Sequence, residues 1–205
     1  MENEDELERK QIPPRTVVVM CLVVESILLI IATSAMVTLN IDLRALFVLK
    51  SKMLVSILVW GLGGGLLVTL SNIAFIKVPK HLSEQFFPLK SMHDLFESEI
   101  VPLFGELSFS DSLLIALASG ICEEIFFRGI LQSYTNVLTC NFCFAMCHFP
   151  SFYYYPYALW AGAVGFLMSF LTLHTGSIYP AILAHAVINL ASLSMARSKA
   201  REHKE

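Results

Sequence analysis

Long apolar segments constrain the fold of this chain more than any other feature. Thr16–Leu39 is an apolar run interrupted only by the charged residue Glu25, and Met53–Phe75 is a second run of similar length. A helix of about 20 apolar residues crosses the hydrocarbon core of a bilayer. A helix also satisfies its own backbone hydrogen bonds in that core. We therefore predict an all-α, polytopic transmembrane helix bundle.

The composition agrees with a membrane protein. Of the 205 residues, 56% are hydrophobic and 15% are charged, whereas about 25% are charged in typical soluble domains. The length suits one compact bundle. No basic block of the kind found in nucleic-acid-binding proteins is present, and the odd number of cysteines, five, does not favour a disulfide framework.

Four further stretches complete the expected bundle of about six membrane segments, two of them short. They are Asp111–Tyr134, Val137–Phe149, Ala158–Leu173 and Ile178–Met195. Residues 77–110 mix prolines, charges and aromatic residues, which is typical of an interfacial or partly re-entrant segment with a short amphipathic helix. The aromatic cluster at residues 152–160 is typical of a membrane–water interface.

We divide the chain into four parts. A polar tail (1–15) precedes two transmembrane helices with the interfacial segment (16–109), a helical core (110–196) and a basic tail (197–205). An even number of crossings places both termini on one side, and the basic C-terminal tail favours the cytoplasm. We thus expect a multi-pass protein of the cell membrane, inner or plasma. The three bases of the 40–52 connector, which would lie outside, count against this orientation.

The first two runs each carry one unusual feature. Glu25 either faces the interior of the bundle or lies near one end and reaches the membrane surface. The glycines of Gly61–Gly65 permit either close helix packing or a kink.

The stretch Gly120–Gly129 places Glu123, Glu124 and Arg128 among apolar residues. Charged side chains within a membrane helix are costly, so they indicate a functional site. We expect Ser110 or Asp111 to cap the helix. Glu123 then lies roughly 18 Å along it, well inside the bilayer.

Helix geometry separates the roles of the three charges. Residues four apart share a helix face, so Glu124 can pair with Arg128, while Glu123 points elsewhere. A free buried carboxylate is a candidate general base. In the alternative interpretation, both carboxylates bind Arg128 and only stabilise the bundle.

Three polar residues on other apolar segments are candidate partners of Glu123: His148, His185 and Asn189. Each alone could simply bond a neighbouring helix. Together they all need buried partners, which one internal cavity holding water would supply. There, Glu123 with His148 could activate water, and His185 with Asn189 could donate hydrogen bonds to an oxyanion. This set of groups suits amide hydrolysis.

Three motifs resemble, in order, those of the CPBP family of intramembrane CAAX amino-terminal proteases, which includes bacteriocin-processing and immunity proteins. They are Glu123-Glu124-x-x-x-Arg128, Phe144-x-x-x-His148 and His185-x-x-x-Asn189. The resemblance covers roughly residues 110–192.

The resemblance implies an intramembrane endopeptidase that acts on a membrane-associated or lipidated protein. It implies Glu123 as the base, His148 as its helper in activating water, and His185 with Asn189 as oxyanion stabilisers. The glutamate–arginine pair would be mainly structural.

The resemblance leaves metal dependence open. Two histidines and a carboxylate can bind zinc, but the His-Glu-x-x-His pattern is absent and the amide of Asn189 is a poor zinc ligand. We therefore favour a site without metal or other cofactor, with zinc as the alternative. Cys140, Cys143 and Cys147 lack the spacing of haem attachment, and we interpret them as small residues that suit a membrane helix.

Two other classes of function remain as alternatives. The chain could be a non-catalytic membrane interaction or immunity protein that retains the site as a scaffold. It could also be a haem or quinone protein with His148 and His185 as ligands, or a proton-coupled transporter with Glu123 as a relay. Neither of these last two interpretations explains the order of the motifs.

Overall fold

The computed structural model describes residues 12–47, 49 and 53–204, and these residues form helices and no strands. The α-helices are α1 (Pro14–Thr38), α2 (Leu54–Ile76), α3 (Lys80–Ser83), α4 (Phe87–Leu95), α5 (Val101–Phe104), α6 (Phe109–Glu124), α7 (Gln132–Tyr134), α8 (Val137–Cys147), α9 (Tyr155–Thr175) and α10 (Tyr179–Glu202). Two π-helical segments, Phe96–Ile100 and Ile125–Leu131, and a 3-10 turn at Phe152–Tyr154 complete the described chain. The predicted all-α bundle is confirmed.

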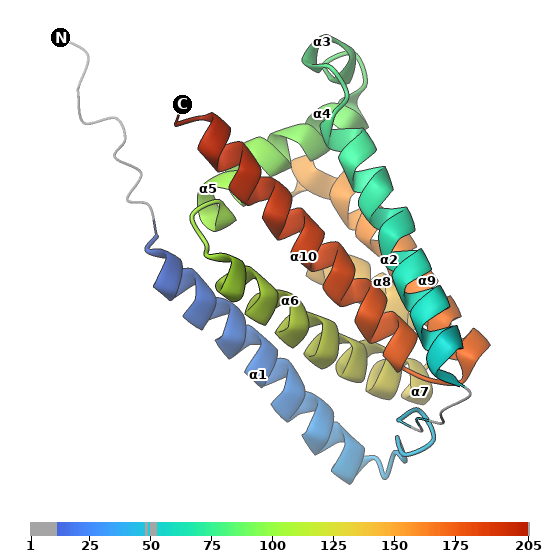
Figure 1. Cartoon of the computed structure of the whole chain (residues 1–205). Helices are drawn as coiled ribbons and strands as arrows, with labels where there is room; N and C mark the ends of the chain where they lie inside the picture. Colours follow the sequence, from blue (N-terminus) through green and yellow to red (C-terminus); the bar gives the residue numbers. More distant parts are fainter. Residues whose placement is uncertain (1–11, 48, 50–52, 205) are drawn as a thin grey trace, which may run out of the picture.

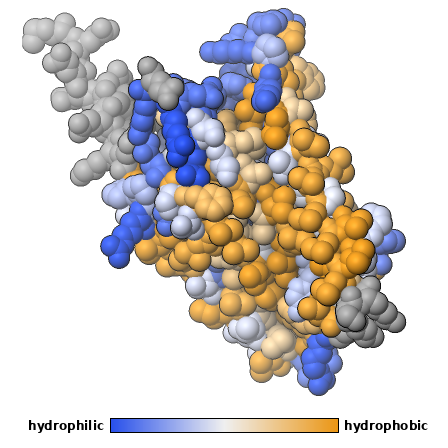
Figure 2. Space-filling model, in the orientation of Figure 1, coloured by the Kyte–Doolittle hydropathy of each residue, from blue (hydrophilic) through white to orange (hydrophobic). Residues whose placement is uncertain are grey.

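Four of the described helices, α1, α2, α9 and α10, are long and apolar enough to cross a membrane. A fifth span is possible if the bent pair Phe87–Phe104 and Phe109–Tyr134 counts as one, and α8 is a shorter apolar helix. The expected number of about six segments, two of them short, agrees with this set. Figure 2 shows apolar residues over the middle of the molecule and polar residues gathered at its ends. The chain is an integral membrane protein.

Helices α6 and α10 lie side by side at the centre of the bundle (Figure 1). Helix α1 packs on α6, α2 packs on α10, and α8 pairs with α9. The start of α1 and the end of α10 lie at the same end of the bundle in Figure 1. The core that carries the three motifs is therefore flanked by the two N-terminal helices.

Two glycines bring α2 close to α10. A Cβ atom on Gly61 would lie 2.9 Å from Leu183 Cδ2, and one on Gly65 would lie 2.9 Å from Val187 Cβ. Helix α2 continues without a break through this stretch. Of the two explanations, close packing is therefore the correct one, because small residues let two backbones approach in a membrane.

Helix α6 begins earlier than expected. Ser108, and not Ser110 or Asp111, is its N-cap: the Ser108 hydroxyl accepts a hydrogen bond from the Asp111 backbone N–H at 3.1 Å. The Asp111 carboxylate accepts in return from the Ser108 backbone N–H at 3.3 Å, which completes a capping box. The predicted cap was wrong because Asp111 acts from the third helical position.

The segment after α6 also differs from the prediction. We expected one α-helix through Tyr134, but the α-helical pattern ends at Glu124 and residues Ile125–Leu131 form a π-helix. Such π segments often occur at functional sites. This one carries Arg128 and so sets the direction of its side chain.

We predict that Gly65→Leu destabilises the protein by about 1–3 kcal/mol, because the new side chain collides with α10. Gly63 is the matched control: it lies on the same helix, is exposed, and has open space around its Cβ position. Thermal unfolding of both variants in the same lipid or detergent would measure the effect. Equal melting temperatures for the two variants would contradict the close packing of α2 on α10.

Candidate active site

Arg128 is the most heavily bonded buried side chain of the site. It is 1% exposed, and its Nη1 donates to Glu124 Oε1 at 3.1 Å. Its Nη2 donates to Asn141 Oδ1 at 3.3 Å and to the Gly165 carbonyl at 2.9 Å. The guanidinium also lies 4.5 Å from the centre of the Phe144 ring, a cation–π contact. The predicted pairing of Glu124 with Arg128 is present, and it is anchored on α8 and α9 as well.

Gly165 has to be small for these contacts to form. A Cβ atom there would lie 2.6 Å from Asn141 Oδ1 and 3.2 Å from Arg128 Nη2. Because α9 has no side chain at this position, its backbone carbonyl reaches the guanidinium directly. Neither Asn141 nor Gly165 was predicted as part of the site.

Glu124 does more than neutralise Arg128. It is fully buried, and its Oε1 also accepts a hydrogen bond from His185 Nδ1 at 2.7 Å. The carboxylate thus links α6 to α10 across 61 positions in the chain. A carboxylate only accepts, so Nδ1 of His185 carries a hydrogen and Nε2 remains as the other functional ring atom.

His148 is positioned by its own helix. It is the C-cap of α8, and its Nδ1 lies 2.8 Å from the Phe144 carbonyl oxygen. A carbonyl only accepts, so Nδ1 is the donor, and in the neutral ring Nε2 is then free to accept a proton. The Phe144 ring lies 4.4 Å from the His148 ring and 6.2 Å from the His185 ring, so it contacts both.

Asn189 is held by a residue that was not predicted. Its Nδ2 donates to Ser119 Oγ at 2.7 Å, and Ser119 is buried on α6. An amide nitrogen has two hydrogens, so Asn189 keeps one donor beyond this bond.

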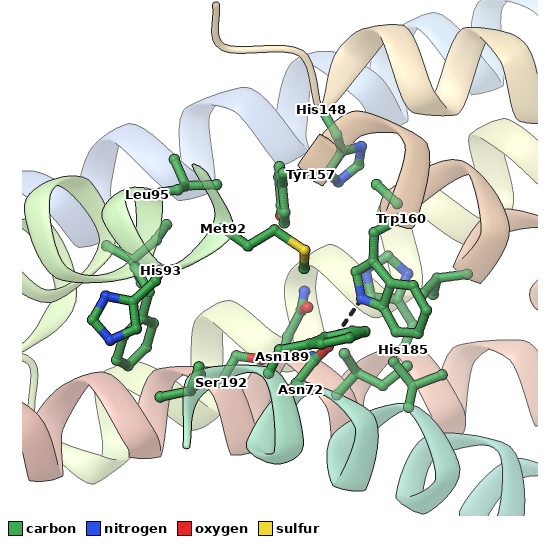
Figure 3. A pocket seen from close by; sticks show the side chains of 18 of the residues that line it. Asn72, Met92, His93, Leu95, His148, Tyr157, Trp160, His185, Asn189 and Ser192 are labelled. Atoms are coloured by element: carbon green, nitrogen blue, oxygen red, sulfur yellow. Dashed lines mark hydrogen bonds between the residues drawn. The ribbon is translucent and has the colours of Figure 1, made fainter. Parts of the chain in front are cut away.

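His148, His185 and Asn189 all line one cavity of about 180 Å³ (Figure 3). The predicted convergence therefore occurs for these three side chains. Glu123 is not in the cavity wall, and its Oε2 is buried without a hydrogen-bond partner among the described residues. Its chain neighbour Glu124 bonds His185, which does line the cavity. Glu123 thus lies beside the cavity and outside its lining.

The remaining wall is mainly apolar and comes from helices outside the three motifs. Trp160 lines it and donates from Nε1 to Asn72 Oδ1 at 2.9 Å, and Tyr157 and His93 also line it (Figure 3). Tyr157 and Trp160 belong to the aromatic cluster that we predicted at the interface, but they turn inward. The two residues are three positions apart, so they share one face of a helix. This spacing could have indicated from the sequence that both side chains point the same way.

Cys140 has a packing role. Cys140 is fully buried in a core cluster with Phe127 and Phe144, and its Sγ–H donates to the Phe127 carbonyl at 3.2 Å. Within residues 12–204, apart from the gaps at 48 and 50–52, all cysteines are free. In the same residues no three His, Cys, Asp or Glu side chains gather as a metal would require.

We predict that Glu124→Ala destabilises the protein by about 3–5 kcal/mol, because it leaves the guanidinium of Arg128 buried without its counter-charge. Asp42→Asn is the control: it breaks an exposed ion pair with Arg44, whose N–O distance is 2.9 Å, and should change the melting temperature little. Thermal unfolding of both variants in the same membrane mimetic would compare them. A Glu124→Ala protein as stable as Asp42→Asn would show that the buried pair does not support the fold.

Comparisons with known proteins point to one family. Residues 105–191 match the family model described as type II CAAX prenyl endopeptidase Rce1-like. An uncharacterized Bacillus subtilis (strain 168) protein, YpbD, is 25% identical over 134 residues, which is 64% of this chain and 65% of that protein. The chain thus spans less than two thirds of the relative's length, and no solved structure matches it significantly. The resemblance of this chain to the family of intramembrane CAAX proteases is confirmed, and Rce1-like is the description of the family model that its motif-bearing residues match.

Proposed function

We propose that this chain is an intramembrane endopeptidase that hydrolyses a peptide bond of a membrane-associated or lipidated protein. The observation that carries the proposal is the single cavity lined by His148, His185 and Asn189. In each histidine, Nδ1 is engaged by an oxygen of the protein, so Nε2 is the atom left for chemistry. The match to a family of prenyl endopeptidases supports a protease.

Water activation is assigned to Glu123 and His148. The neutral His148 ring can accept a proton at Nε2, and Oε2 of Glu123, which has no partner among the described residues, is a second acceptor. The water oxygen attacks the carbonyl carbon of the substrate while its proton passes to this pair. The same proton then moves to the amide nitrogen as the C–N bond breaks, so no other reactant is required.

Stabilisation of the developing oxyanion is assigned to His185 and Asn189. Asn189 offers its second N–H, because the first is used by Ser119. His185 donates from Nε2 when its ring carries both protons, and the Glu124 carboxylate at Nδ1 stabilises that positive charge. Donors held in place before the reaction need no reorganisation, and this is why such sites lower the barrier. Glu124 and Arg128 act as structural support for His185.

The substrate class follows from the wall of the cavity and from the family. Most of the wall is apolar, and the cavity lies in a protein that is itself embedded in lipid. An apolar chain attached to a peptide, or an apolar peptide segment, would fit this lining. A prenylated protein is the first candidate, because the matched family is described as prenyl endopeptidases.

We also propose that the protein resides in the cell membrane with both termini in the cytoplasm. The C-terminal part of α10 carries Arg197, Lys199 and Arg201, and positively charged segments next to a membrane helix favour that side.

We predict that Glu123→Gln, His148→Ala and His185→Ala each abolish processing while the protein still inserts and folds. Mass spectrometry of the termini of membrane proteins, in cells with the wild type and with each variant, would identify the lost cleavage products. His81→Ala is the control, because His81 is exposed on the short helix α3. Unchanged termini in the Glu123→Gln cells would reject the mechanism, and would favour the non-catalytic alternative.

We predict that a strong chelator leaves cleavage intact, because the proposed mechanism activates water with Glu123 and His148 and uses no metal. The measurement is the rate at which purified protein in lipid vesicles cleaves a farnesylated peptide, with and without chelator. Inhibition that added zinc reverses would show that the reaction depends on a metal.

A further inference from the structure

Glu25 is a buried carboxyl group with no role in the mechanism above. It lies near the middle of α1 and is 8% exposed. Val18, Glu25 and Ala32, spaced by seven, form the buried stripe of that helix. Of the two orientations that we considered, the structure therefore selects the one that faces the bundle.

The position of this stripe places Glu25 against the motif helix. On the N-terminal side, Val18 packs with Ile115 of α6, and on the C-terminal side Ala32 packs with Ile130 of the π segment. Glu25 lies between these two apolar clusters. Helix α1 therefore presents a carboxyl group to the part of α6 that ends in the two glutamates.

Glu25 lies level with the glutamates of α6. Helix α1 packs along α6, and the two clusters pair Val18 with Ile115 and Ala32 with Ile130, so Glu25 falls beside Cys122 and Glu123. The thiols of Cys21, on its own helix, and of Cys122, on α6, are the other titratable groups at this level. Among the described residues, Oε2 of Glu25 and Oε2 of Glu123 are both buried without a partner.

The balance of charges decides which of the two carboxyl groups, Glu25 or Glu123, carries a proton. Arg128 and Glu124 cancel each other, which leaves at most the positive charge of His185 against Glu123 and Glu25. Two ionised carboxylates would exceed that charge in an apolar setting, where neighbouring carboxyl groups do not both ionise. Glu25 is buried, whereas Glu123 is partly exposed, so the proton belongs on Glu25.

We propose that Glu25 is a positioning residue of the active site: it is the protonated member of a buried carboxyl pair with Glu123 and keeps Glu123 as the ionised base. The proposal rests on the proposed function, in which Glu123 accepts the proton of water. Glu25 keeps its own proton throughout, so it takes no part in the proton transfer. Replacement by glutamine, which is neutral and similar in shape, should therefore preserve what Glu25 does.

Infrared spectroscopy of the protein in lipid tests the protonation directly. A protonated carboxyl group has a C=O band distinct from that of a carboxylate, and this band shifts in D₂O. At pH 7 the wild type should show such a band, and Glu25→Gln should lose it. A wild type without the band, or a band that survives in Glu25→Gln, would overturn the assignment of the proton.

A processing assay tests the positioning role. We expect Glu25→Leu to slow the appearance of the cleaved termini about tenfold or more, and Glu25→Gln to restore most of that rate. Thr69→Val is the matched control: Thr69 is another buried side chain with an unpartnered oxygen, on α2 and away from the glutamates. Its rate should equal that of the wild type.

The outcomes separate this inference from the proposed function. Processing lost in Glu123→Gln but unchanged in Glu25→Leu would reject the role of Glu25 and retain the protease. Processing unchanged in Glu123→Gln would reject the protease itself. A Glu25→Gln variant as slow as Glu25→Leu would show that the position needs an ionisable group, which contradicts a permanently protonated Glu25.

Discussion

The buried guanidinium of Arg128 is the charge on which the rest of the site depends. A cation inside an apolar bundle is tolerated only if counter-charge and hydrogen-bond acceptors are in place, because the cost of removing it from water is several kcal/mol. Three acceptors meet that need: the carboxylate of Glu124, the amide oxygen of Asn141 and the carbonyl of Gly165. They come from α6, α8 and α9. The buried arginine can therefore be satisfied only when these three helices pack together around it.

The same network positions the side chains of His148 and His185. Glu124 shares its Oε1 between Arg128 and His185, so the position of the α10 imidazole is tied to that of the arginine. Phe144 stacks under the guanidinium and contacts both imidazole rings, while its backbone carbonyl holds His148. Structural and proposed catalytic residues are thus directly bonded. The same bonds therefore stabilise the fold and hold the proposed catalytic side chains in position.

The cavity and the carboxylates are formed by different residues. The cavity opens among α2, α4, α8, α9 and α10 and has mostly apolar walls, and neither Glu123 nor Glu25 lines it. In the proposed mechanism the apolar walls receive the substrate, and Glu123 acts from beside them. The proposed pairing of Glu25 with Glu123 would give the N-terminal helix a chemical reason to be packed against the motif-bearing core.

Periodicity and charge were enough to predict the features that depend on short stretches of chain. The apolar runs predicted the membrane helices, the spacing of four predicted the contact between Glu124 and Arg128, and the order of the motifs identified the family. The cap at Ser108 and the π-helical segment were missed, because each depends on small differences in local backbone energy. The bond from Glu124 to His185 and the inward direction of Glu25 were decided only by the tertiary structure. Sequence spacing describes neighbours on one helix, but the contacts between helices depend on the depth and rotation at which they pack.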